Sequence, residues 1–166
     1  MPDVISSQRA ALQTIVDNAI GEQLSIATKV AFNPIDAERQ LLLLDTNLPL
    51  LAVYLLPGRQ KHRSGGTTAG GKANLETKWG VALVQDMAAA AQHGLIPNFA
   101  ATQDQVTDVM ESVMLALQSQ VKAVFNLGAG IELDYDPVPL LSKNGQPLYA
   151  FVVTFSATKE VTIAAS

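Results

Sequence analysis

Apolar side chains recur with helical spacing near the start of the chain. Over residues 6–20 they share one face of a predicted helix, at Leu12, Ile15, Val16, Ala19 and Ile20. Ser6 or Ser7 is placed to cap the first turn, and Gly21 stands where a glycine commonly ends a helix. We therefore predict an amphipathic helix that packs against a core through this face.

A longer helix is predicted over residues 102–125. Its apolar stripe comprises Val106, Val109, Met110, Val113, Leu117, Val121 and Val124. Thr102 and Gln105 have the spacing of a capping box, in which each side chain bonds to the backbone N–H of the other residue. The preceding segment, residues 86–101, combines a run of alanines with Gly94 and Pro97, and predicts a short helical turn followed by a loop.

Three segments in the first half of the chain have strand character. Residues 50–56 form a short apolar run between Pro49 and Pro57-Gly58, which favours a buried strand. Residues 74–84 alternate between apolar and polar positions, which predicts a strand buried on one face. Residues 30–32 predict a further short strand.

The last part of the chain is predicted to form a hairpin. Residues 131–141 and 148–155 alternate as two strands, joined by Asn144-Gly145, a dipeptide typical of a tight hairpin turn. Because proline cannot donate a backbone hydrogen bond, Pro137 and Pro139 confine the first of these strands to a sheet edge or a bulge.

The order of these elements predicts an α+β fold. We expect a mainly antiparallel or mixed sheet of about four strands, with two main helices packed on it, in a single domain that spans residues 1–166. A long glycine-rich hairpin loop, residues 59–72, connects two of the strands. It contains no large apolar side chain, so we expect it to be mobile.

Composition excludes several classes of protein. The chain is 48% hydrophobic and only 16% charged, which excludes intrinsic disorder. It has no cysteine, so disulfides and a thiolate nucleophile are excluded, and its net charge of −4 argues against a protein that coats nucleic acid. We find no export signal. The most apolar stretch, residues 41–56, is interrupted by polar residues and proline, so we expect no membrane span.

Two charged clusters are candidate binding surfaces. The glycine-rich loop carries Arg59, Lys61, His62, Arg63 and Lys72. These residues form either a solvated loop or a contact with an acidic partner or nucleic acid. On the C-terminal hairpin Glu132, Asp134 and Asp136 project from one face of a strand. They form either an acidic solvent or interface face or, with further oxygen ligands, a cation site.

The loop also contains a nucleotide-like string. Residues 66–72 match G-x-x-x-x-G-K, but Ala73 follows where the phosphate-binding motif requires Ser or Thr, and a strand rather than a helix comes next. Neither His62 nor His93 lies in a recognisable catalytic motif. We therefore expect no enzymatic activity, no cofactor and no metal, with a nucleotide-binding enzyme that uses residues 66–72 as a remote alternative.

In the order of its elements and in several local strings, the chain resembles the tail terminator proteins of long-tailed bacteriophages, the family represented by lambda minor tail protein U. The resemblance extends from the helix over residues 6–20 to the C-terminal hairpin. Its strings are DTNLPLLAVYL (45–55), VMESVM (109–114), LDYD (133–136) and LYAFVVTF (148–155).

The resemblance implies a structural virion protein with no catalytic role. Such proteins form a hexameric ring at the head-proximal end of the tail tube, stop its polymerisation and offer a surface to the neck or head-completion protein. DNA passes through the channel without specific binding, and assembly takes place in the host cytoplasm. A head–tail connector or neck adaptor of the same machine is the alternative. We hypothesise that Arg59, Lys61 and Arg63 of one subunit meet Glu132, Asp134 or Asp136 of the next subunit.

Overall fold

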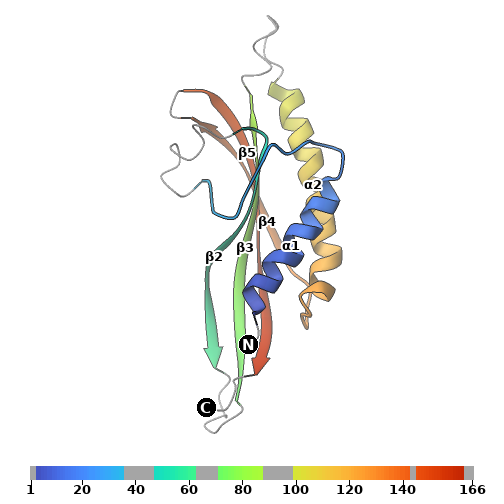
Figure 1. Cartoon of the computed structure of the whole chain (residues 1–166), viewed down its shortest axis with the longest axis vertical. Helices are drawn as coiled ribbons and strands as arrows, with labels where there is room; N and C mark the ends of the chain where they lie inside the picture. The colour runs from blue at the N-terminus through green and yellow to red at the C-terminus, as the bar shows by residue number, and fades with distance from the viewer. Residues whose placement is uncertain (1–2, 36–46, 63–70, 88–98, 143–144, 163–166) are drawn as a thin grey trace, which may run out of the picture.

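A single sheet carries both helices on one face (Figure 1). The computed structural model describes residues 3–35, 47–62, 71–87, 99–142 and 145–162. Its elements are α1 (Val4–Ile20), β1 (Thr28–Val30), β2 (Leu50–His62), β3 (Lys72–Asp86), α2 (Phe99–Val124), β4 (Leu133–Leu141) and β5 (Pro147–Thr162). The predicted α+β class is confirmed, although the described sheet has five strands rather than about four.

The strand order is β1-β2-β3-β5-β4. The short β1 runs parallel to β2 and pairs only with Leu50–Ala52, and all other neighbours are antiparallel. Most of β2 therefore forms one edge of the described sheet, and β4 forms the other. The prediction that Pro137 and Pro139 lie on an edge strand is confirmed.

The main core lies between the helices and the sheet. Trp79, at the centre of β3, is fully buried in it, together with Leu12 and Val16 of α1 and Met110 and Leu117 of α2. The apolar faces predicted for both helices are thus confirmed, except at Val124, which is 51% exposed. Phe125, the next residue, is buried instead and lies 6.3 Å from the ring of Phe155.

A buried polar contact fixes α1 on the sheet. Gln8 is only 4% exposed, and its Oε1 accepts hydrogen bonds from Thr77 Oγ1 at 2.8 Å and from Trp79 Nε1 at 3.2 Å. The neighbouring Arg9 places its guanidinium 5.9 Å from the centroid of the Trp79 ring, within the range of a cation–π contact. The helix is therefore held in one rotation and one position along β3.

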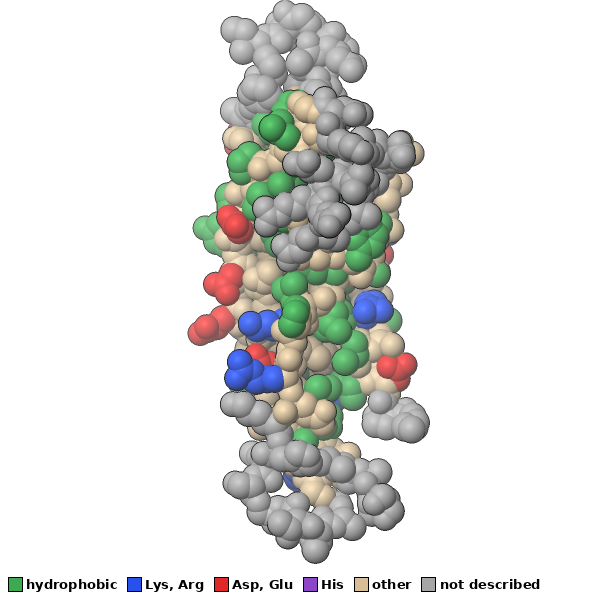
Figure 2. Space-filling view, turned by 90° about the vertical axis from the view of Figure 1, so that its left-hand side faces the viewer, with side chains coloured by type: hydrophobic (Ala, Val, Ile, Leu, Met, Phe, Trp, Pro, Cys, Tyr) green, Lys and Arg blue, Asp and Glu red, His purple; other side chains and the backbone are tan. Residues whose placement is uncertain are grey.

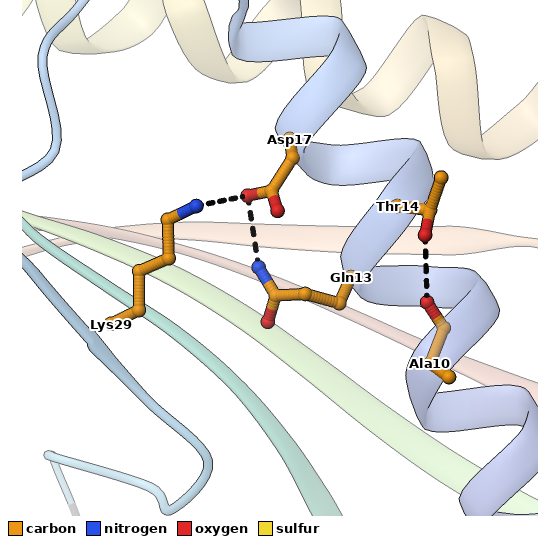
Figure 3. Close-up of polar contacts among 5 residues, drawn as sticks. All are labelled: Ala10, Gln13, Thr14, Asp17 and Lys29. Atoms are coloured by element: carbon orange, nitrogen blue, oxygen red, sulfur yellow. Dashed lines mark hydrogen bonds and ion pairs between the residues drawn. The ribbon is translucent and has the colours of Figure 1, made fainter.

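The opposite end of α1 is linked to β1. Lys29 Nζ of β1 and Gln13 Nε2 both lie 3.0 Å from Asp17 Oδ1, as Figure 3 shows. Thr14 Oγ1 also donates to the carbonyl of Ala10 within the helix. Since the Lys29 and Asp17 side chains are partly exposed, the ion pair adds at most about 1 kcal/mol.

The second face of the sheet, turned away from the helices, is also buried at the end of the sheet where β1 pairs with β2. There the side chains of Tyr54, Val84 and Leu148 form a smaller cluster with alanines at 52, 82 and 150. The prediction that the strand over residues 74–84 is buried on one face only is therefore wrong for residues 79–84. The apolar residues of β2 and β5 flank β3 on both faces, and Val30 and Ile35 pack on this second cluster.

The predicted helix starts were wrong by one turn or less. Asp3, rather than Ser6 or Ser7, caps α1, because its carboxylate accepts from the Ser6 N–H at 3.3 Å. Helix α2 begins at Phe99, so Thr102 lies inside it and no capping box forms there. Alanines at 100 and 101 are strong helix formers and extend the helix toward its N-terminus. Gly21 ends α1 with a φ of +50°, as predicted.

The lengths of β2, β3 and β5 were underestimated, whereas β4 begins two residues later than predicted. β2 continues through Pro57-Gly58 to His62, because a β-bulge between Leu56 and Arg59 accommodates the proline on an edge strand. Residues 59–62 and 72 are therefore strand residues and not part of a loop. The predicted strand at residues 30–32 lies two residues earlier, as β1. Gly145 has the positive φ that the hairpin turn requires, +78°.

Other predicted features lie outside the described residues. These are residues 63–70 of the glycine-rich loop, Asn144 of the hairpin turn, and residues 88–98 of the predicted turn and loop. Neither helix of the described chain is long and apolar enough to cross a membrane.

Gly80 provides a test of this packing. A Cβ at this position would collide with the Tyr54 ring, which is itself fully buried. We expect Gly80→Ala to lower the free energy of unfolding by about 1–3 kcal/mol, as overpacking does in tight cores. Denaturant unfolding measures the change. Gly130→Ala is the matched control, because a Cβ there meets nothing within 4 Å. Equal stability of the two variants would contradict the packing of Tyr54 on Gly80.

Candidate assembly surface

Two adjoining hollows lie on the second face of the sheet, between β2 and β4. Their volumes are about 300 and 400 Å³, and Leu56, Asp134 and Thr154 line both. Ile35, Tyr54 and Val152 give the first hollow an apolar floor, and Lys78 lines the second. In Figure 2, which shows this face, acidic side chains gather along one side and basic side chains lie beside and below them.

The acidic side of this face is formed by β4 and the residue before it. Asp134 and Asp136 pair with Thr154 and Val152 of β5, so all four side chains point to the second face. Glu132 also lines a hollow but precedes β4, because the strand begins at Leu133, and the prediction that it belongs to the strand is wrong. We call Glu132, Asp134 and Asp136 the acidic edge. All three are exposed.

The chemistry of the hollows suits a long cationic side chain. Arginine and lysine bury an apolar stem while keeping the charged head near water or a carboxylate. An apolar floor beside the carboxylates of Asp134 and Asp136 offers both environments. Among the described residues, no group of three His, Cys, Asp or Glu side chains is arranged to hold a metal ion.

Most of the basic candidates lie on the strands that follow the bulge. Arg59, Lys61 and His62 belong to β2, and Lys72 begins β3, whereas Arg63 lies outside the described residues. Arg59 is exposed. In the register of the two strands it lies opposite Glu76 of β3, on the same face as Lys78. We call Arg59 and Lys61 the basic edge, since these two positions lie two residues apart on β2, which is an outer strand of the described sheet over this part of its length.

Lys72 has a partner within the chain. Its Nζ lies 2.9 Å from Glu160 Oε1 of β5. It begins a strand, whereas the lysine of a phosphate-binding loop precedes a helix whose N-terminus holds the phosphate. The described part of the chain therefore gives the nucleotide-binding alternative no support.

The two edges cannot meet within one chain. They lie on opposite sides of the sheet, three strand spacings or about 14 Å apart, with β3 and β5 between them. Sequence reasoning identified both sets of charges, and the alternation over residues 74–84 correctly placed Lys78 on the face opposite Trp79. It did not predict the hollows. It also missed the exposure of Tyr135, whose alternation with acidic residues indicated a buried position.

No protein-family model matches the chain, and no curated protein matches it. A protein chain in a solved structure described as "Virion of native gene transfer agent (GTA) particle" aligns with 97% of this chain and 100% of its own length, at 15% identity and a TM-score of 0.48. That score is too low to establish a common fold, so this likeness carries no argument about function.

Substitution of Lys72 distinguishes a structural role of this lysine, in the ion pair with Glu160, from a role in nucleotide binding. Because both side chains are substantially exposed, we expect Lys72→Ala to lower the free energy of unfolding by less than about 1 kcal/mol. Calorimetry with ATP should give no binding heat for the natural chain or for the variant, and Lys78→Ala is the control lysine on the same strand. ATP binding that Lys72→Ala abolishes would contradict this interpretation.

Proposed function

We propose that this chain is a structural protein of a phage-like virion, whose copies join side by side in a ring. The observation that carries the proposal is the opposite charge of the two edges of one sheet. The basic edge lies on β2, and the acidic edge lies on β4 and the residue before it, on opposite sides of the described sheet. The surfaces differ from each other, so the contact is heterologous and repeats from copy to copy.

The strand directions support such a contact. β2, β3, β5 and β4 alternate in direction, so β4 of one copy runs antiparallel to β2 of the next copy when the two edges meet. Antiparallel neighbours bring pairs of side chains directly opposite each other on each face. A heterologous contact of this kind closes into a ring when its rotation divides a full turn.

The charges of the two edges determine which surfaces of the copies meet more than they determine how tightly the copies bind. A single exposed ion pair contributes about 0–1 kcal/mol and weakens as salt rises. Several pairs across each interface, repeated around a ring, add up and speed correct encounters between copies. The acidic hollows strengthen this match, since they hold the stem as well as the head of a basic side chain.

Within this class of protein we propose the role of tail terminator. The sequence resemblance supports it, and the α+β fold agrees with the fold that the resemblance implies. A hexameric ring would cap the head-proximal end of the tail tube, because one face matches the last ring of tube protein and the other does not extend the tube. The opposite face would receive the neck or head-completion protein, and DNA would pass through the channel without specific contacts.

Reversing charge on either edge tests the contact between copies. Arg59→Glu and Asp134→Arg should each weaken ring formation about 3–10-fold at low salt, since each places like charges opposite one another. A mixture of the two variants should restore assembly, because in a ring of alternating copies every interface pairs opposite charges, Glu with Arg at one interface and Arg with Asp at the next. Light scattering gives the mass of each sample.

Glu111→Lys on the exposed side of α2 is the control for altered net charge. Its assembly should match that of the natural protein. Failure of the mixture to recover the mass that each single variant loses would rule out this pairing of edges.

The place of the ring in the virion needs a separate experiment. Purified protein is mixed with headless tail tubes or with tailless capsids, and the complexes are examined by negative-stain electron microscopy. A terminator should bind one end of the tubes, and tubes assembled in its presence should stop growing. Binding to capsids alone would assign the chain to the connector or neck-adaptor alternative.

A further inference from the structure

The helix-side face of the acidic edge carries an exposed aromatic residue. Tyr135 lies between Asp134 and Asp136 on β4 but points to the other face of the strand, and it is 63% exposed. Its ring stacks on Phe151 of β5 at 5.6 Å between centroids and 10° between planes. The stack supports one side of the ring and leaves much of the side chain in solvent, as in an anchor prepared for a partner.

The helix-side face of β2 has a complementary hollow. It has a volume of about 260 Å³ and lies at the β-bulge, where Gly58 and Gln60 line it from β2. Ile5 of α1, Leu55 of β2 and Leu75 of β3 make it apolar. Leu55 is 37% exposed, a noticeable exposure for a leucine within a strand.

One register brings both pairs of surfaces together. When β4 of one copy runs antiparallel to β2 of the next with Asp134 opposite Arg59, Glu132 lies opposite Lys61. The same register places Tyr135 opposite Pro57–Gly58, at the bulge that opens the apolar hollow. Opposite residues in an antiparallel pair point to the same face, so Asp134 and Arg59 meet on the second face and Tyr135 lies on the helix side.

We propose that the Tyr135 side chain of one copy fills the hollow lined by Ile5, Leu55 and Leu75 of the next copy. This inference rests on the proposed ring, and it names the residue that supplies most of the affinity of its interface. Aromatic side chains that enter a hollow near the centre of an interface dominate binding energy, while surrounding charged contacts contribute less.

Backbone pairing between the two edges is incomplete. Pro57 on β2 and Pro137 and Pro139 on β4 lack an N–H, so the ladder of backbone hydrogen bonds is interrupted at these positions. Side chains on both faces therefore supply much of the contact, with an apolar contact on the helix side and charge pairs on the other face.

Cysteine cross-linking tests the register directly, because the chain has no cysteine of its own. Two single variants, Tyr135→Cys and Pro57→Cys, are purified, mixed and mildly oxidised. We expect a disulfide between the two variants at least about 10-fold more abundant than with Leu141→Cys and Pro57→Cys. Leu141 is a matched control, since it lies on the same strand and face and is 60% exposed.

Truncation measures the strength of the anchor. We expect Tyr135→Ala to weaken self-association at least about 10-fold, Tyr135→Phe to change it less than about 3-fold, and Leu141→Ala to leave it unchanged. Gln60→Trp, which fills the hollow from within the same chain, should weaken association as Tyr135→Ala does. Denaturant unfolding of each variant confirms that it remains folded.

The outcomes separate the two proposals. Rings that form normally with Tyr135→Ala, or that give no preferred Tyr135→Cys to Pro57→Cys disulfide, would overturn the anchor and leave the ring intact. A chain that stays monomeric at all concentrations and gives no disulfide would overturn both. The expected disulfide in a protein that binds neither tail tubes nor capsids would support the anchor and overturn the virion role.

Discussion

The structure depends on the burial of β3 on both faces of the sheet. Trp79 is fully buried on the helix side, where Gln8 accepts a hydrogen bond from its indole. One residue later, Gly80 leaves room for the Tyr54 ring on the other face. A strand covered in this way cannot slip by one residue, because a slip would exchange the two faces and place the indole where only a glycine fits. The placement of the helices, the register of the sheet and the position of both edges follow from this burial of β3.

Because β3 and β5 occupy the interior, features that a partner can reach gather on β2 and β4. Each edge strand has two chemically different faces. β4 presents carboxylates on one face and an aromatic ring on the other, and β2 presents an exposed arginine on one face and an apolar hollow on the other. An edge strand has a direction and two different faces, and a partner must match both faces in a single register. It therefore accepts a partner in far fewer ways than a flat charged patch does.

Sequence patterns predicted the local elements well and their ends less well. The helical stripes around Leu12 and Met110 are strong because both helices cover the same core, whereas the first turn of α2 depends on alanines that carry no periodic signal. Pro57-Gly58 indicated the end of a strand, yet an edge strand tolerates both residues within a bulge. The two-sided burial of residues 79–84 could not be predicted, because it depends on contacts with β2 and β5 that are remote in the sequence.

The candidate surface was predictable in its charges and not in its shape. Alternation identified the acidic residues of β4, but the hollows arise only when β2 and β4 come together on one sheet, with Asn33 and Ile35 closing the first hollow. Tyr135 has the same alternation as a core residue and is nonetheless exposed, because it lies on the outermost strand.

The prolines of the two edges also bear on how such a chain behaves when it is abundant. Unprotected sheet edges invite indiscriminate stacking through the backbone, which leads to fibrils and insoluble aggregates. Pro57 on one edge and Pro137 and Pro139 on the other interrupt the row of amide donors that such stacking requires. The prolines therefore oppose indiscriminate backbone stacking at both edges of the described sheet.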